Sequence, residues 1–174
     1  MRKILLATAL LSLFGANAQE INSSFVDAAT LSIGESRDGI KIYRLGLRKD
    51  FSSKWLESKV GYLSGYYEGS INYWKGESGD KNYGIALSPV FAYYLDAGDF
   101  KPFVEFGIGV SLFKEKVIDG RNLSTNFLFE DRIGVGARYK NLEFSFRFMH
   151  YSNASIKAPN DGIDIWIGAV SYKF

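Results

Sequence analysis

Cysteine is absent from this chain of 174 residues, which also has only three prolines and one histidine. Without cysteine there can be no disulfide framework of the kind that holds many small exported domains together. A structural zinc site takes four cysteine or histidine ligands, and so this class of site is not expected either. The residues present call for no metal ion and no cofactor.

Long hydrophobic runs are also missing. The apolar stretch from Ile4 to Phe14 is shorter than the roughly 20 residues that a membrane-spanning helix needs. Two cations precede it and Ala16-Asn17-Ala18 follows it, an order typical of a secretory signal peptide and its cleavage site. We predict that residues 1–18 are a cleaved signal peptide and that residues 19–174 form one exported domain.

Charge of one sign is not in excess. Removing Arg2 and Lys3 with the leader leaves 19 Lys+Arg (21 − 2) against 19 Asp+Glu. Binding to nucleic acid depends on a basic excess that neutralises phosphates. No nucleic-acid partner is therefore expected.

Aromatic residues and glycine are abundant instead, with 14 Phe, 11 Tyr, 3 Trp and 18 Gly. An exported chain that is rich in aromatic residues and glycine, and has no apolar helix, is typical of a β-barrel of the outer membrane. A secreted β-sandwich is the alternative that composition alone leaves open.

Apolar and other residues alternate with a period of two in several segments, which predicts β-strands. The clearest case is residues 142–152, where Leu142, Phe144, Phe146 and Phe148 share one face and Glu143, Ser145 and Arg147 share the other. Lys140-Asn141 before it is a candidate hairpin turn, which would place Arg138 opposite Glu143. With this segment, the predicted strands number eight: 26–33, 40–48, 55–67, 82–95, 103–113, 129–139, 142–152 and 164–174.

Glycine and charge on the polar faces favour a barrel over a sandwich. In a small transmembrane barrel the apolar face meets lipid, and the narrow lumen requires small residues and paired charges. We therefore predict an all-β fold, an eight-stranded antiparallel transmembrane β-barrel, which is too narrow for a porin channel. The charges expected to pair inside are Glu105, Glu130, Arg132, Arg138, Glu143 and Arg147.

The C-terminus supports this prediction. Val170, Tyr172 and Phe174 alternate up to a terminal phenylalanine, which resembles the last strand of outer-membrane proteins in Gram-negative bacteria. We predict location in that membrane, with both chain ends periplasmic. The parity of this strand turns Trp166 and Asp164 outward.

The only histidine, His150, lies two residues before Ser152 on the lipid-facing side of the penultimate strand. Residues two apart on a strand are about 6.8 Å apart, a gap across which an imidazole can lean to activate a serine. Asp164 on the last strand could orient the imidazole. Counting through the hairpin turn offers Asp131 as a rival carboxylate, and His150 could instead be an ordinary residue of the membrane interface.

The stretch His150–Gly162, "HYSNASIKAPNDG", resembles the signature of the lipid A 3-O-deacylase (PagL) family. Its recurring elements, His-x-Ser-Asn-Ala and Pro-Asn-x-Gly, stand here at His150–Ala154 and Pro159–Gly162. The close match covers residues 127–164. The resemblance implies an eight-stranded outer-membrane barrel that acts as a serine esterase on lipid A, the anchor of lipopolysaccharide.

The resemblance implies that Ser152 is the nucleophile, His150 the base and Asp164 the acid, although the family's usual acid is glutamate. An oxyanion hole is expected beside the serine, and its candidate donors are Asn153 and Ala154. Phe148 and Trp166 flank the site and could contact an acyl chain or simply belong to an interfacial aromatic belt. A homodimer is possible.

Two other functions stay open at this point. The first is an outer-membrane phospholipase, which also places His and Ser two apart on a barrel wall but usually has a larger barrel. The second is a non-catalytic adhesin or anchor, for which residues 66–82 would be the one long extracellular loop.

Overall fold

A computed structural model describes residues 25–174 of the protein. The predicted signal peptide, residues 1–18, and the start of the predicted domain at residue 19 lie outside the described residues and stay predictions. Residues 25–174 contain no helix that is both long enough and apolar enough to cross a membrane.

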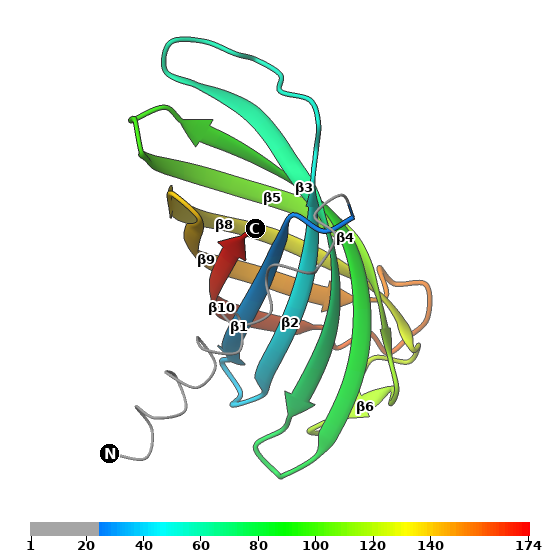
Figure 1. Cartoon of the computed structure of the whole chain (residues 1–174). Coiled ribbons are helices and arrows are strands. Elements are labelled where there is room, and N and C mark those ends of the chain that lie inside the picture. The colour runs from blue at the N-terminus through cyan, green and yellow to red at the C-terminus, as the bar shows by residue number, and fades with distance from the viewer. Residues whose placement is uncertain (1–24) are drawn as a thin grey trace, which may run out of the picture.

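Eight antiparallel strands close into a barrel (Figure 1), which confirms the predicted fold class and strand number. A further two-stranded sheet, formed by β6 and β7, lies in the connection between β5 and β8. Around the barrel the order is β1-β10-β9-β8-β5-β4-β3-β2. The bounds are β1 Ala28–Ser36, β2 Lys41–Asp50, β3 Gly61–Lys75, β4 Lys81–Leu95, β5 Phe100–Phe113, β6 Val117–Ile118, β7 Arg121–Asn122, β8 Phe127–Tyr139, β9 Leu142–Ser152 and β10 Ile163–Lys173.

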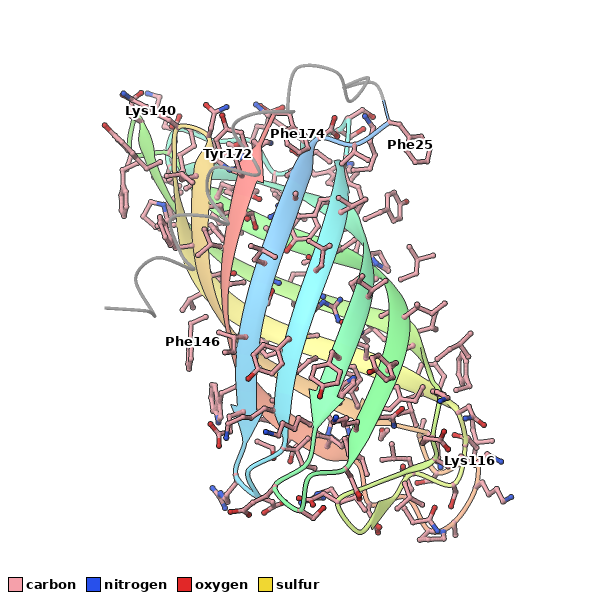
Figure 2. All side chains as sticks on the ribbon, turned by 60° about the horizontal axis from the view of Figure 1, so that its bottom comes forward. Phe25, Lys116, Lys140, Phe146, Tyr172 and Phe174 are labelled. Atoms are coloured by element: carbon pink, nitrogen blue, oxygen red, sulfur yellow. The ribbon has the colours of Figure 1, made fainter. Side chains whose placement is uncertain are left out.

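The two ends of the barrel differ. Figure 2 shows Phe25 and Phe174 at the same end as Lys140, and Lys116 at the opposite end. We call these the terminal end and the loop end. The turn at Lys140-Asn141 is the predicted one, and it places Arg138 opposite Glu143 as expected.

The prediction of a long loop over residues 66–82 is wrong. Strand β3 continues to Lys75 and pairs with β4 along its whole length, so that only a short turn separates the two strands. The alternation was obscured because two inward positions carry the aromatic residues Tyr66 and Trp74, and an outward position carries Gly69. The longer segments at the loop end are residues 114–126 and 153–162.

Side chains on the two faces of the sheet meet opposite environments. Outward-facing Ile133 and Phe146 are 63% and 53% exposed, whereas inward-facing Glu130 and Arg147 are fully buried. This distribution is the reverse of that in a protein surrounded by water, where a contiguous apolar surface of this extent would drive association. It is stable when the outer wall faces lipid and the charges are enclosed.

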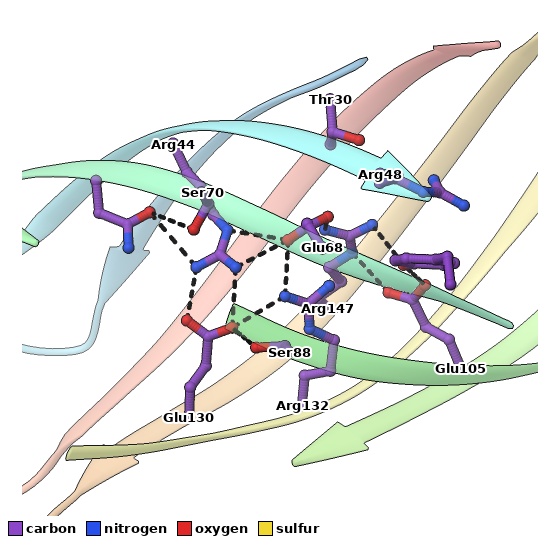
Figure 3. A network of polar contacts seen from close by, with 12 residues as sticks. Thr30, Arg44, Arg48, Glu68, Ser70, Ser88, Glu105, Glu130, Arg132 and Arg147 are labelled. Atoms are coloured by element: carbon purple, nitrogen blue, oxygen red, sulfur yellow. Dashed lines mark hydrogen bonds and ion pairs between the residues drawn. The ribbon is translucent and has the colours of Figure 1, made fainter. Parts of the chain in front are cut away.

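The enclosed charges form ion pairs in the middle of the lumen (Figure 3). Arg44 contacts Glu130 at 2.6 Å and Glu68 at 2.8 Å, and Arg132 contacts both glutamates at 3.0 and 2.9 Å. All four side chains are at most 1% exposed. The sequence prediction included Glu130 and Arg132 but did not include Arg44 and Glu68, which supply the other half of this network.

A second set of contacts continues the network toward the terminal end. Arg147 contacts Glu105 at 2.6 Å, and the hydroxyl of Tyr66 donates to the same carboxylate at 2.7 Å. Gly134 makes room for this pair, because a Cβ there would lie 3.0 Å from Arg147 Cγ and 3.2 Å from Glu105 Oε1. Glu143 pairs with two arginines, Arg48 at 2.6 Å and Arg138 at 2.8 Å.

The loop end of the lumen is apolar, which the expectation of a lumen filled by glycine and charge did not include. Ile118 and Leu123, from the β5–β8 connection, pack there against inward side chains of the strands. The connection thus closes the barrel with a hydrophobic plug, which also buries the ring of Tyr151 between the two candidate site residues. The plug comprises Ile40, Ile42, Trp74, Phe113, Ile118, Leu123, Leu128, Met149, Tyr151, Ile163, Ile165 and Ile167.

Replacing Glu68 by glutamine should destabilise the barrel by about 3–5 kcal/mol, because Arg44 and Arg132 would keep buried charges with one fewer carboxylate. The measurement is the midpoint of urea-induced unfolding in detergent micelles. Asp96→Asn is the control, since Asp96 pairs with Lys101 on the surface and exposed pairs contribute little. Equal midpoints for Glu68→Gln and the control would contradict the role of the network.

Candidate active site

The pairing of β8, β9 and β10 brings one histidine between two carboxylates. His150 lies directly opposite Asp131 on β8 and directly opposite Asp164 on β10. All three positions have the parity of the outward apolar residues, because His150 follows Phe146 and Phe148 in steps of two. The structure has the register that the hairpin turn predicted for Asp131 and the outward face that parity predicted for Asp164. The row of these three residues lies near the loop end of the wall.

The histidine contacts Asp164. Its Nδ1 lies 2.6 Å from Asp164 Oδ1, a short distance typical of a hydrogen bond to a charged group. No hydrogen bond joins His150 to Asp131 within residues 25–174. Asp164 reaches the ring although it is shorter than a glutamate, because directly opposed residues have Cβ atoms only about 4.5–5.5 Å apart. A proton on Nδ1 leaves Nε2 as the acceptor of the ring.

Ser152 is the last residue of β9 and has the same outward parity as His150. It is only 9% exposed. No hydrogen bond joins its hydroxyl to His150 among the described residues; its Oγ instead lies 3.5 Å from the backbone nitrogen of Ala154. The spacing of about 6.8 Å along the strand leaves the approach of hydroxyl and imidazole to side-chain rotation.

Asn153 holds the segment that follows the serine. Its amide nitrogen donates to the carbonyls of Leu123 at 2.8 Å and Lys157 at 2.7 Å, and its backbone N–H donates to the side chain of Asn160 at 3.0 Å. Both amide hydrogens are thus donated to carbonyls, which corrects the expectation of a free side-chain donor at this position. Ala154 and Ser155 follow with positive φ of 52° and 62°, as the chain leaves the ladder.

Two residues that sequence reasoning did not assign to the site position it. Gly162 has φ of 60°, and a Cβ at this position would lie 3.2 Å from Cε1 of His150. Arg121, from β7, donates to the carbonyls of Asp161 and Gly162 at 3.2 and 3.0 Å and also pairs with Asp38. Gly162 stands in the quoted motif, whereas no local pattern connects Arg121 with a segment forty residues away.

Aromatic rings cover the wall next to the histidine, one and two rows toward the terminal end. Trp166 is stacked on Phe146 with ring centroids 5.3 Å apart and contacts Phe148 at 4.9 Å. Trp166 is 53% exposed. Phe148 and Trp166 are directly opposite each other in the ladder, with their ring planes tilted by 59°. Together they give an apolar surface one row from His150 and Asp164, on the side toward the terminal end.

Within residues 25–174, no three histidine, cysteine, aspartate or glutamate side chains lie close enough to hold a metal ion. A histidine oriented by a carboxylate and a serine hydroxyl two residues away on the same strand face are parts of a nucleophilic hydrolase.

The fold and the site define a class of protein: an outer-membrane β-barrel that carries a histidine–carboxylate pair on its outer wall. The chain belongs to the lipid A 3-O-deacylase (PagL) family, whose sequence model matches residues 41–173. The family resemblance found in the sequence is thereby confirmed.

Known relatives agree with this assignment. The chain is 36% identical over 166 residues to the lipid A deacylase PagL of Pseudomonas aeruginosa, with 94% of each chain covered. It is 34% identical over 73 residues to the lipid A deacylase PagL of Bordetella bronchiseptica, with 41% of each covered. A crystal structure of the outer membrane enzyme PagL matches with a TM-score of 0.81 and 34% identity, over 84% of this chain and 99% of that one.

Replacing Asn153 by alanine should loosen residues 153–162, because the carbonyls of Leu123 and Lys157 would lose their donor, at about 1 kcal/mol or more each. Lys157 lies exposed in this segment, so that the variant should be cut by trypsin after Lys157 faster than the parent protein. Asn141→Ala, at the terminal end, is the control. An unchanged cleavage rate would show that Asn153 does not hold the segment.

Proposed function

We propose that this protein removes the ester-linked 3-hydroxyacyl chain from position 3 of lipid A, as a serine esterase of the outer membrane. The observation that carries the proposal is the 2.6 Å contact between His150 and Asp164 on the outer wall, two residues from Ser152. Family membership supports the substrate, since the relatives are named lipid A deacylases. A site on this wall is open only to molecules in the membrane.

In this mechanism Asp164 keeps the proton of His150 on Nδ1, so that Nε2 can take the proton of the Ser152 hydroxyl. The serine oxygen attacks the ester carbonyl, and the resulting oxyanion needs N–H donors. The backbone N–H of Ala154 is the proposed donor, and Asn153 contributes by holding the segment in place. Collapse of the intermediate expels the sugar oxygen, which takes the proton from His150 and leaves an acyl-enzyme.

Water completes the reaction. His150 accepts a proton from water, whose oxygen attacks the acyl-enzyme, and Ser152 leaves with a proton as the 3-hydroxy fatty acid is released. Phe148 and Trp166 are the proposed contacts for the acyl chain, because they form an apolar surface directly beside the histidine row. Lipid A in the outer leaflet reaches His150 and Asp164 by diffusing within the membrane to the outer wall of the barrel. A homodimer and a cleaved leader stay predictions.

Ser152→Ala should lower the rate of deacylation by roughly 10⁴-fold or more, since the nucleophile is removed while binding is kept. The measurement is the mass of lipid A from cells that express each variant. The parent protein should lower this mass by that of one hydroxyacyl group. Ser78→Ala, an exposed serine in the β3–β4 turn, should act like the parent. Continued loss of the hydroxyacyl group in Ser152→Ala would end the proposal.

Asp164→Asn and Asp131→Asn distinguish the two carboxylates that flank His150. Only the former should lower the rate constant for hydrolysis, by roughly 10²–10⁴-fold, because an amide cannot stabilise the imidazolium that forms during the reaction. The measurement is the rate at which each purified variant releases the hydroxy acid from lipid A under the same conditions. If the loss is confined to Asp131→Asn, the acid of the site is Asp131.

A further inference from the structure

The opposite wall of the barrel carries an ordered set of side chains that the proposed reaction does not use. Strands β2, β3 and β4 pair there so that like residues stand side by side in three outward rows near the loop end. The rows are Lys41–Lys75–Lys81, Tyr43–Tyr73–Tyr83 and Leu45–Ile71–Ile85, in order from the loop end toward the middle of the wall.

The lysine row is unusual because like charges directly opposite each other destabilise a sheet. Lys41 is compensated by Glu35 at 2.8 Å. Within residues 25–174, neither Lys75 nor Lys81 has a carboxylate within ion-pair distance. Lys75 and Lys81 are directly opposed in the ladder and exposed, and thus have no ion-pair partner in the part of the chain that the structure describes.

Two further lysines, Lys114 and Lys116, follow directly after the end of β5. The backbone nitrogen of Lys114 donates to the carbonyl of Tyr83 at 2.8 Å, which places Lys114 next to the tyrosine row. A surface hollow of about 530 Å³ lies beside it, lined by Lys81, Lys114 and Lys116 together with Asp80, Glu115, Val117 and Asn126. Cations outnumber carboxylates in this hollow, and Glu115 is 3.8 Å from Lys114.

The tyrosine row and the aliphatic row indicate how deep the lysines lie in the membrane. Tyr73 is packed against Tyr43 at 6.0 Å and Tyr83 at 5.3 Å between ring centroids, and tyrosine rows mark the boundary between headgroups and acyl chains. Ile71 and Ile85 below them are 60% and 56% exposed, as is usual for residues that face acyl chains. The lysines therefore lie at the level of lipid phosphates.

This surface is separate from the candidate active site. Strand β1 lies between β10 and β2 on one side, and β8 and β5 lie between β9 and β4 on the other. A lipid held by the lysine row would thus not be the lipid whose ester meets Ser152.

We propose that the lysine row, with Lys114 and Lys116, binds the phosphates of a second, non-reacting anionic glycolipid of the outer leaflet, of the lipid A class. The tyrosine row contacts its sugar region and the aliphatic row its acyl chains. The order of the three rows supports a lipid rather than a free anion. Charged, aromatic and aliphatic rows follow one another along the wall in the same order as the phosphates, sugars and acyl chains of a glycolipid. The inference goes beyond the proposed function and depends only on placement in the outer membrane.

The test is the rate at which an N-hydroxysuccinimide ester acetylates each lysine, followed by mass spectrometry, with the full-length barrel in neutral phospholipid nanodiscs. Adding bisphosphorylated lipid A should slow acetylation of Lys75 and Lys81 by about fivefold, the value for roughly four-fifths occupancy. Lys59 and Lys140, near the terminal end, should not change. Lipid A without phosphates, or inorganic phosphate alone, should protect none of them.

A variant pair gives the second measurement. In Lys75→Gln/Lys81→Gln, protecting Lys114 from acetylation should require a roughly 25-fold higher concentration of lipid A. Each lysine removed should weaken binding to the anionic lipid by about fivefold. Lys75→Arg/Lys81→Arg should restore the affinity, and Lys59→Gln/Lys140→Gln should not alter it.

Protection by phosphate-free lipid A, protection by inorganic phosphate, or an unchanged requirement in the glutamine variant would each overturn the proposal. Removing one acyl chain leaves the phosphates in place, so that the outcome does not depend on hydrolysis. Failure of the proposed reaction and failure of this lipid site are therefore separate results.

Discussion

The pairing of buried arginines with buried glutamates in the lumen is the interaction on which the rest of the structure depends. Arg44, Glu68, Glu130 and Arg132 come from β2, β3 and β8 and contact one another in the middle of the barrel. A slip of one residue in any of these strands would point a charged side chain toward lipid and an apolar side chain into the lumen. Because neither exchange is tolerated, the network specifies the register of the strands.

Register in turn builds the candidate site. Since β8, β9 and β10 are fixed relative to one another, Asp131, His150 and Asp164 fall in one row on the outer wall. The β5–β8 connection adds a second constraint, because its Leu123 accepts a hydrogen bond from Asn153, and its Arg121 holds the carbonyl of Gly162. The candidate site on the lipid-facing wall is thus held both by paired strands and by a loop that plugs the lumen.

Alternation predicted much of the fold because, away from the apolar plug at the loop end, each barrel face meets one environment. Residues 142–152 were predicted with the bounds that β9 has in the structure, since apolar and polar residues alternate there without interruption. The prediction failed over residues 66–82, where small polar residues and glycine make a strand look like a loop. Glu68 was left out of the predicted ion pairs because it lies in this stretch. The contact of Arg44 with Glu130 joins residues far apart in the chain, which no local pattern reports.

The sequence alone determined the class of fold, the outward direction of His150 and Ser152 and the family, because these follow from a period of two and from a contiguous motif. Tertiary structure decided which carboxylate contacts His150, where the donors of Asn153 go and that three lysines stand side by side on the far wall. Each of these depends on the spatial pairing of segments that are distant in the chain. The energy that selects that pairing comes from closing the barrel around its buried charges.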